Sequence, residues 1–194
     1  MAREPGINAV PHTPTEDLCL DFVNSRFHDH RGTGAVYDRL PLQGWWEWLV
    51  ARWELGPCPV PDAPQLAALR RLRTLSRLLL EDASGPRPRD VAALNRVLAA
   101  APQAWHVAGS AGTVDVGLRP VTRDVASVAA AVVVSLVDVL AAGRDSIHAC
   151  ENPSCSFLFR DTSRNGSRRW CDAAICGNLV KVRAFRAGQR PGGR

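Results

Sequence analysis

The chain has 194 residues, and 46% of them are hydrophobic, which is enough for a globular core and excludes the composition of a disordered protein. No apolar run reaches the roughly 18–20 residues that span a bilayer, and the N-terminus has no apolar signal segment, so we expect a cytoplasmic protein without a membrane partner. The net charge of +5 comes from the C-terminal quarter: residues 144–194 hold ten Lys or Arg against four Asp or Glu, whereas residues 1–143 hold fourteen against fifteen. A basic segment of this kind favours an acidic partner such as nucleic acid.

The first elements in chain order are weakly defined. Residues 1–14 carry three prolines and are expected to form a flexible lead-in. Residues 16–26 have an apolar pattern too short to distinguish a strand from a short helix. Residues 27–44 contain two glycines close together and are expected to form a loop.

A tryptophan-rich helix follows. Trp45, Leu49 and Trp53 are spaced i, i+4 and i+8, so they lie on one helical face. Two uses of these aromatic side chains stay open: packing in the core, or a ligand pocket for an apolar or aromatic small-molecule effector. The residues of that candidate pocket are Trp45, Trp46, Trp48 and Trp53.

The rest of the N-terminal part predicts three helices and a hairpin. Repeating leucines predict an amphipathic helix from Pro64 onward, and Asp90 is expected to cap the next helix. Alternating residues on both sides of GSAGT predict a small β-hairpin. A long helix over roughly residues 122–142, ended by Gly143, completes the domain. The expected fold class is mainly α (α+β), with a helical N-terminal domain at 15–143.

This N-terminal part shows no catalytic pattern. It lacks the G-x-x-x-x-G-K-[ST] phosphate loop and the G-x-S-x-G nucleophile turn. No set of nucleophile, base and orienting residue can be grouped from the sequence. We therefore expect that the protein is not an enzyme.

Four of the six cysteines form two C-x4-C pairs near the C-terminus, with fifteen residues between the pairs. Structural Zn²⁺ sites take four ligands in a tetrahedron, and cysteine thiolate is a preferred ligand. Clustered cysteines in a reducing compartment bind metal more often than they pair. We therefore expect a closed zinc site, with two disulfides, simple burial and an iron–sulfur cluster as alternatives. The expected ligands are Cys150, Cys155, Cys171 and Cys176.

The segments around these cysteines are basic. A hairpin through the turn sequence RNG is expected to bring the second pair back to the first. The segment after Cys176 predicts a helix with Arg183, Arg186 and Arg190 on one stripe. Such side chains suit phosphate contacts, and a helix can reach base edges; a solvated basic face that binds nothing is the alternative. The candidate DNA-binding residues are Arg164, Arg168, Arg169, Asn178, Lys181, Arg183 and Arg186.

These motifs resemble the CGNR-type zinc finger of bacterial proteins. DTSRNGSRRWC at 161–171 and CGN at 176–178 match its pattern, whereas Leu179 stands where the family has arginine. LCLDFVNSR at 18–26 is similar to the opening motif of the ABATE domain, which precedes this finger in the same family. The resemblance implies a stress-linked transcription regulator with Zn²⁺ as cofactor and DNA as partner.

The combined hypothesis is a two-part protein. A treble-clef-like four-cysteine zinc finger at 144–194, with a basic C-terminal helix, would bind DNA. The ABATE-like helical domain at 15–143 would sense a ligand or mediate homodimerisation. Two other functions stay open: a finger that serves as a structural or protein-interaction module, and RNA binding.

Overall fold

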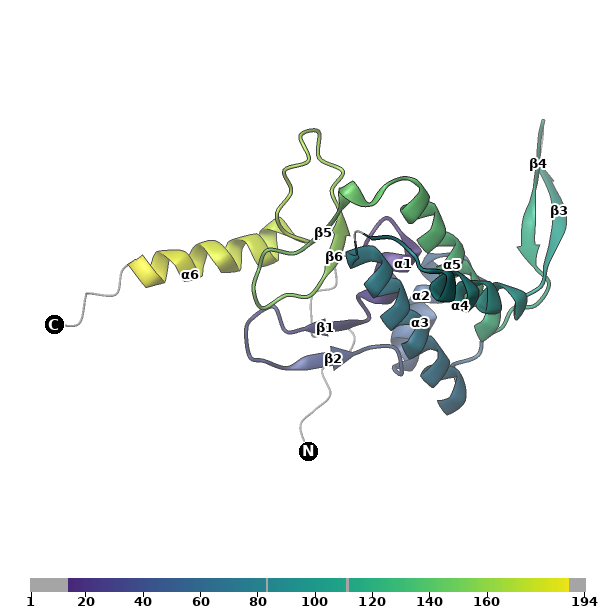
Figure 1. Ribbon diagram of the computed structural model, residues 1–194, viewed down its shortest axis with the longest axis horizontal. Coiled ribbons are helices and arrows are strands. Elements are labelled where there is room, and N and C mark those ends of the chain that lie inside the picture. Colours follow the sequence, from purple (N-terminus) through teal and green to yellow (C-terminus); the bar gives the residue numbers. More distant parts are fainter. Residues whose placement is uncertain (1–13, 83, 111, 189–194) are drawn as a thin grey trace.

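A helical body with three two-stranded antiparallel sheets makes up the described part of the chain, which confirms the expected α+β class (Figure 1). The computed structural model describes residues 14–82, 84–110 and 112–188; the lead-in at 1–13 and Arg190 of the predicted basic stripe lie outside them. The helices are α1 (Leu18–Val23), α2 (Gln43–Arg52), α3 (Ala63–Glu81), α4 (Pro88–Ala99), α5 (Val125–Ala141) and α6 (Asn178–Gly188). The strands pair in chain order and are β1 (Arg26–His28), β2 (Val36–Asp38), β3 (Gln103–Ser110), β4 (Thr113–Pro120), β5 (Ile147–Ala149) and β6 (Leu158–Arg160).

The ambiguous segment at 16–26 forms helix α1 and the start of strand β1. The loop predicted for 27–44 is not a plain loop, because it contains strand β2 and the start of α2, and Phe27 pairs with Tyr37 across the two strands. Strands of three residues are too short to show the alternation from which a strand is predicted. Gly32, with φ +81°, supplies the left-handed backbone that the connection between the strands requires.

Helix α5 is the centre of the body, and α1, α3 and α4 all pack against it. Its buried face consists of Val125, Val128, Ala130, Val132, Val133, Leu136 and Val139. The long helix predicted here is confirmed: Asp124 caps it by accepting the Ser127 N–H at 2.8 Å, and Gly143 follows its end with φ +95°. Across the described residues, every helix is too short or too polar to cross a membrane.

Helix α2 carries the tryptophans to the core. Trp45 and Trp46 are 1% and 0% exposed, and Trp48 and Trp53 are half-buried beside them. The Trp53 Nε1–H donates to the buried Asp21 carboxylate at 3.0 Å. Trp45 and Trp46 therefore pack in the core, and a ligand pocket lined by the four tryptophans stays a prediction.

Helix α3 begins with a capping box, and α4 begins with half of one. In α3, Asp62 Oδ1 accepts the Gln65 N–H at 2.8 Å and Gln65 Oε1 accepts the Asp62 N–H at 2.9 Å. Helix α4 begins at Pro88, earlier than the sequence predicts. Asp90 is therefore not the capping residue but the third helical residue, where it accepts the Arg87 N–H at 3.0 Å. Proline suits the first turn because no partner is needed there for its missing N–H.

The predicted hairpin is present as β3 and β4, and these two strands project from the body as an arm (Figure 1). The register pairs Trp105 with Leu118 and Val107 with Val116. Each strand makes its main contacts with the other strand and not with the body.

The C-terminal segment packs against the body. Asn24, which is 0% exposed, donates to the Leu158 carbonyl at 2.8 Å and accepts the Leu158 N–H at 2.9 Å. Arg160 binds both oxygens of Asp17 at 2.8 Å. Leu158 itself lies in the main core. The two parts of the chain therefore share one packed interface across sequence separations of 134 and 143 residues.

Candidate zinc centre and nucleic-acid interface

The short sheet of β5 and β6 positions the first cysteine pair. Cys150 follows β5, and its N–H donates to the Phe157 carbonyl at 2.9 Å. Cys155 lies in the turn between the strands, where its N–H donates to the Asn152 carbonyl at 2.8 Å. Both thiols therefore lie on one short loop whose ends are fixed by strand pairing.

The loop between the two cysteine pairs folds back differently from the predicted hairpin. Strand β6 pairs with β5, and the returning segment reaches this sheet through the Glu151 N–H, which donates to the Arg169 carbonyl at 2.9 Å. The Asp161 carboxylate accepts the N–H groups of Ser163 and Arg168, each at 2.8 Å. A hydrogen bond from the Ser163 side chain first, and then these two backbone N–H groups, hold the pKa of Asp161 below its usual value. The Asp161 side chain thus accepts the backbone N–H groups of this loop that a second strand would bind in a regular hairpin.

The second cysteine pair lies at the start of α6. The Asp172 carboxylate accepts the Ile175 N–H and its carbonyl accepts the Cys176 N–H, both at 2.9 Å, which closes the turn. Gly177 follows, and a Cβ at this position would lie 3.0 Å from the Trp170 ring. The glycine of CGN therefore lets the indole lie directly against the backbone beside the thiols.

The four thiols converge on one point. All four Sγ atoms lie within 4.8 Å of one another. The Sγ atoms of Cys155 and Cys171 are 3.8 Å apart, and those of Cys171 and Cys176 are 3.7 Å apart. A tetrahedron with Zn–S bonds of about 2.3 Å has S···S edges of about 3.8 Å, whereas a disulfide measures about 2.05 Å. An iron–sulfur cluster distributes its cysteines over different iron atoms and spreads them farther apart. The spacing therefore fits a single tetrahedral Zn²⁺ ion.

The crowding of the thiols also favours a bound cation. Cys150 accepts hydrogen bonds from its neighbours, from Cys155 first, and these lower its pKa below the usual thiol value. The same proximity to Cys150 raises the pKa of Cys171. One thiolate therefore opposes ionisation of the next. A bound Zn²⁺ would hold all four as thiolates and remove this repulsion.

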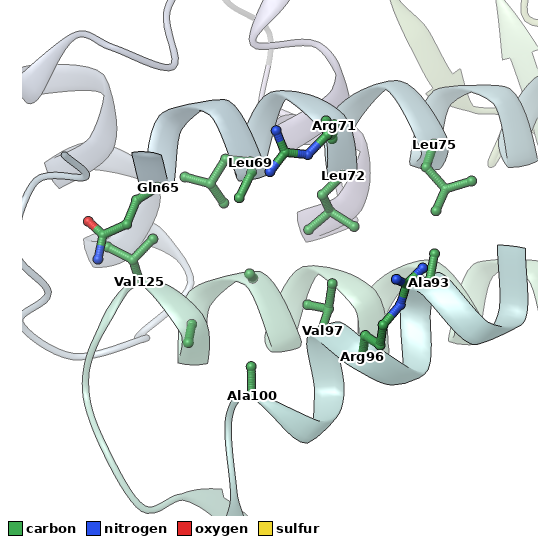
Figure 2. A pocket seen from close by; sticks show the side chains of 13 residues that line it. Gln65, Leu69, Arg71, Leu72, Leu75, Ala93, Arg96, Val97, Ala100 and Val125 are labelled. Atoms are coloured by element: carbon green, nitrogen blue, oxygen red, sulfur yellow. The ribbon is translucent and has the colours of Figure 1, made fainter. Parts of the chain in front are cut away.

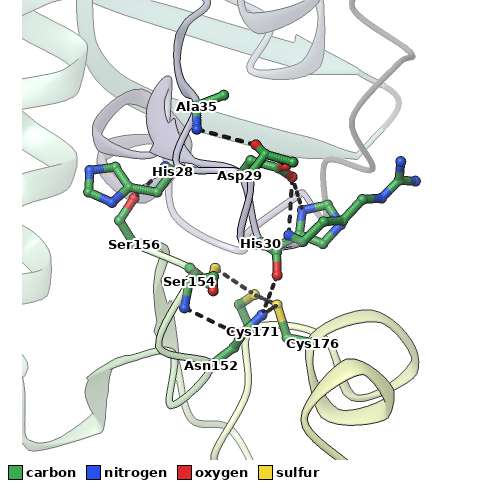
Figure 3. Close-up of polar contacts among 12 residues, drawn as sticks. His28, Asp29, His30, Ala35, Asn152, Ser154, Ser156, Cys171 and Cys176 are labelled. Atoms are coloured by element: carbon green, nitrogen blue, oxygen red, sulfur yellow. Dashed lines mark hydrogen bonds and ion pairs between the residues drawn. The ribbon is translucent and has the colours of Figure 1, made fainter. Parts of the chain in front are cut away.

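The turn between β1 and β2 lies over the thiols (Figure 3). Asn152 Nδ2 donates to Cys176 Sγ at 3.4 Å and to the His30 carbonyl at 3.0 Å. Arg183 donates to the same carbonyl at 3.3 Å and to Asn152 Oδ1 at 3.2 Å. A donor to sulfur stabilises the charge of a ligating thiolate. His30 thus supports the site through its backbone, and its imidazole lies outside the four-sulfur cluster.

Two of the predicted DNA-binding side chains make hydrogen bonds within the finger, although Arg168 is exposed and Arg183 is half-buried. Arg183 makes the contacts just described. Arg168 donates to the Trp170 carbonyl at 3.0 Å and to the Cys171 carbonyl, and its guanidinium lies 4.8 Å from the centre of the Phe159 ring. These two arginines therefore shape the zinc loop.

The other predicted side chains face solvent. The exposed ones are Arg164 in the loop and Asn178, Lys181 and Arg186 on α6. Arg169 is 60% exposed, but it pairs with Glu151, whose carboxylate lies 2.6 Å from its Nε. Helix α6 extends away from the body, so a partner can approach its side chains (Figure 1).

Comparison with protein families gives two matches. Residues 16–143 match the model of the ABATE family, described as "putative stress-induced transcription regulator". The chain belongs to the ABATE family. Residues 147–189 of this ABATE protein match the CGNR zinc finger. No curated protein matches the chain.

These matches confirm the resemblance that the motifs indicate, and with the thiol geometry they identify the cluster of the ABATE chain as a zinc site. Leu179, which replaces the family's arginine, is half-buried in the first turn of α6. Sequence reasoning missed three buried polar residues that position the site: Asn24, Asn152 and Asp161. The available signal was weak: each is a short polar side chain beside an apolar or cysteine-rich motif.

Proposed function

We propose that the protein is a cytoplasmic, zinc-dependent DNA-binding transcription regulator. The observation that carries this proposal is the exposure of three cationic side chains on the finger: Arg164 in its loop and Lys181 and Arg186 on α6. Within residues 14–82, 84–110 and 112–188, the structure describes no ion pair for these three side chains. Exposed cations of this kind can neutralise phosphates and release the counterions bound to them.

The shape of α6 supports the same proposal. Its 11 residues correspond to a length of about 16 Å, and the major groove of B-DNA admits an α-helix. Asn178 lies at its start, where an amide side chain can reach a base edge. The zinc cluster fixes the root of the helix. The helical domain then senses an effector or mediates homodimerisation, and neither matched family is an enzyme family.

A salt-dependent titration tests the proposal. Duplexes selected from a random pool by the zinc-loaded full chain are labelled, and fluorescence anisotropy is measured at several salt concentrations. Lys181→Ala and Arg186→Ala are each expected to weaken binding and to reduce the log–log salt slope by about one. Arg89→Ala is the matched control, because its side chain on α4 is 74% exposed and distant in sequence from the finger. Absence of duplex binding by zinc-loaded protein at low salt would contradict the proposal.

A structural or protein-interaction module is the second candidate. It is favoured by the Asn24 and Asp17 contacts, which join the finger to the body. It predicts that zinc removal lowers the melting temperature of the helical body while no nucleic acid is bound. RNA binding is examined in the same titration with duplex and single-stranded RNA as competitors.

A further inference from the structure

One face of the arm is apolar and exposed. Alternate side chains of a strand share a face, so the pairs Trp105–Leu118 and Val107–Val116 lie on the same side of the arm, together with Val114. These five residues are defined here as the arm face. Their exposed fractions are 74% for Trp105, 51% for Leu118, 65% for Val107, 60% for Val116 and 81% for Val114.

Such a ribbon is not expected to stand alone in water. A two-stranded hairpin is marginally stable without packing against something else. Taking about 150 Å² for each side chain, the lower end of the range for aromatic residues because four of the five are aliphatic, the exposed fractions correspond to about 500 Å² of apolar surface. That is within the range for the largest apolar patch of a typical monomer, and such patches are often interaction sites.

A second uncovered apolar surface lies at the root of the arm. Helices α3 and α4 both pack on α5, and a groove of about 530 Å³ lies between them (Figure 2). Leu72 and Leu75 line one side, Ala93 and Val97 line the other, and Val125 lies at the end where α5 begins. Three polar side chains also line this largely apolar groove: Gln65, Arg71 and Arg96. The arm is inserted between the end of α4 and the start of α5, so the arm and the groove begin at the same place.

We propose that the arm of one copy lies in the groove of a second copy and that the exchange is reciprocal about a two-fold axis. A chain that carries both an apolar ridge and an adjacent apolar groove can use both in both copies, which closes the assembly as a dimer. Covering two arm faces removes about 1,000 Å², and the groove walls that the arms cover add to it, so the contact reaches the range of about 1,200–2,000 Å² found for stable interfaces.

A second copy covers both the arm face and the groove, whereas the other possible occupants cover only one of these surfaces. A small effector in the groove leaves the arm face in water, and one arm packed on another leaves both grooves open. The role of this dimer rests on the proposed DNA-binding function, because a dimer presents two DNA-binding elements to two half-sites.

The first test measures mass. Sedimentation of the zinc-loaded full chain, without DNA, is expected to give a dimer of the 21.0 kDa chain. Trp105→Ser is expected to raise the dimer dissociation constant by about 100-fold or more, because tryptophan is a typical interface hot spot and Trp105 is the largest side chain of the arm face. His106→Ser, at the next residue and on the opposite face, is the matched control and should leave the dimer intact. Circular dichroism verifies that both variants stay folded. A wild-type chain that stays monomeric at high concentration, or a Trp105→Ser chain that dimerises as well as the control, overturns the proposal.

The second test identifies the surface of the second copy that the arm contacts. Ala68 is exposed and lines the groove, whereas Ala92 is exposed on α4 outside it. Ala68→Glu is expected to weaken the dimer, and Ala92→Glu is expected to leave it unchanged. A photo-crosslinking residue at position 105, in a mixture of isotopically light and heavy chains, should link light chains to heavy chains within 88–99. Links from arm to arm, or only within one chain, overturn the proposal. Because neither test contains DNA, the dimer and the DNA-binding function can fail independently.

Discussion

Asn24→Ala should destabilise the contact between the zinc finger and the helical body. The side chain is 0% exposed and its two hydrogen bonds, at 2.8 and 2.9 Å, satisfy both backbone groups of Leu158. Removing it leaves a buried N–H and a buried carbonyl each without this partner, at about 1–3 kcal/mol apiece. We therefore expect a loss of about 2–5 kcal/mol in the free energy of unfolding, which for a chain of this size lowers the melting temperature by roughly 5–15 °C.

The assay is urea denaturation at a fixed free zinc concentration, with tryptophan fluorescence as the signal. Asn95→Ala, at an exposed asparagine of α4, is the control and should change stability by less than about 0.5 kcal/mol. Leu158 begins the strand that follows Cys155, so zinc release to a chromogenic chelator should also be faster in Asn24→Ala than in the control. An unfolding free energy within about 0.5 kcal/mol of wild type would refute the reasoning.

Three further predictions concern thiols, packing and pH. In the zinc-loaded protein, Cys58 should be the most reactive thiol, because it is half-buried, whereas Cys19 is buried and its burial raises its pKa to about 12. The test is thiol labelling with and without a chelator, read by mass spectrometry. The four finger thiols should react only after zinc removal. Gly177→Ala places a methyl group against the neighbouring indole and should cost about 1–3 kcal/mol with faster zinc loss, whereas Gly188→Ala, which meets nothing within 4 Å, should do neither in the same denaturation and chelator assays. Burial opposes ionisation of Asp38, but its arginine partners outweigh this effect and hold its pKa below the usual value, so its stabilisation is complete above about pH 4 and is lost as the pH falls through the lower folded-state pKa. Asp38→Asn should therefore be less stable than wild type by a constant amount from about pH 7 to 5, and the difference in urea midpoints should narrow only below about pH 4; a difference that already shrinks between pH 7 and 5 would contradict this assignment.

The zinc ligands could be predicted because their signal is local. Each C-x4-C pair closes within one short turn, and only the meeting of the two turns depends on the rest of the fold. The long helices were predictable for a similar reason, since the leucine spacing of α3 and the Asp124 cap and Gly143 end of α5 lie within or beside the helix they define. Strands β1 and β2 were not predicted, because three residues carry too little periodicity and their pairing depends on the turn between them.

The division of the arginines could not be predicted. Arg168 and Arg186 look alike in the sequence and both are exposed, but Arg168 donates to backbone carbonyls within the finger, and Arg186 lies on α6. The distinction depends on the returning loop, which places carbonyl oxygens beside Arg168. Asn24 and Leu158 were equally inaccessible, because a contact across 134 residues leaves no local pattern.

The exchange of side chains between body and finger has a consequence for protein engineering. Phe27 comes from β1, yet it packs edge-on against Phe157 at 5.4 Å and belongs to the aromatic and cysteine cluster around the zinc site. Leu158 comes from the finger and belongs to the core of the body. A graft of residues 147–188 onto another protein would lack Phe27 and would expose Leu158, which packs in the core of the body. The smallest portable zinc unit therefore includes the ribbon of β1 and β2. A chimaera between ABATE proteins should have two junctions, one after residue 40 and one before β5, so that residues 14–40 and the finger come from the same parent.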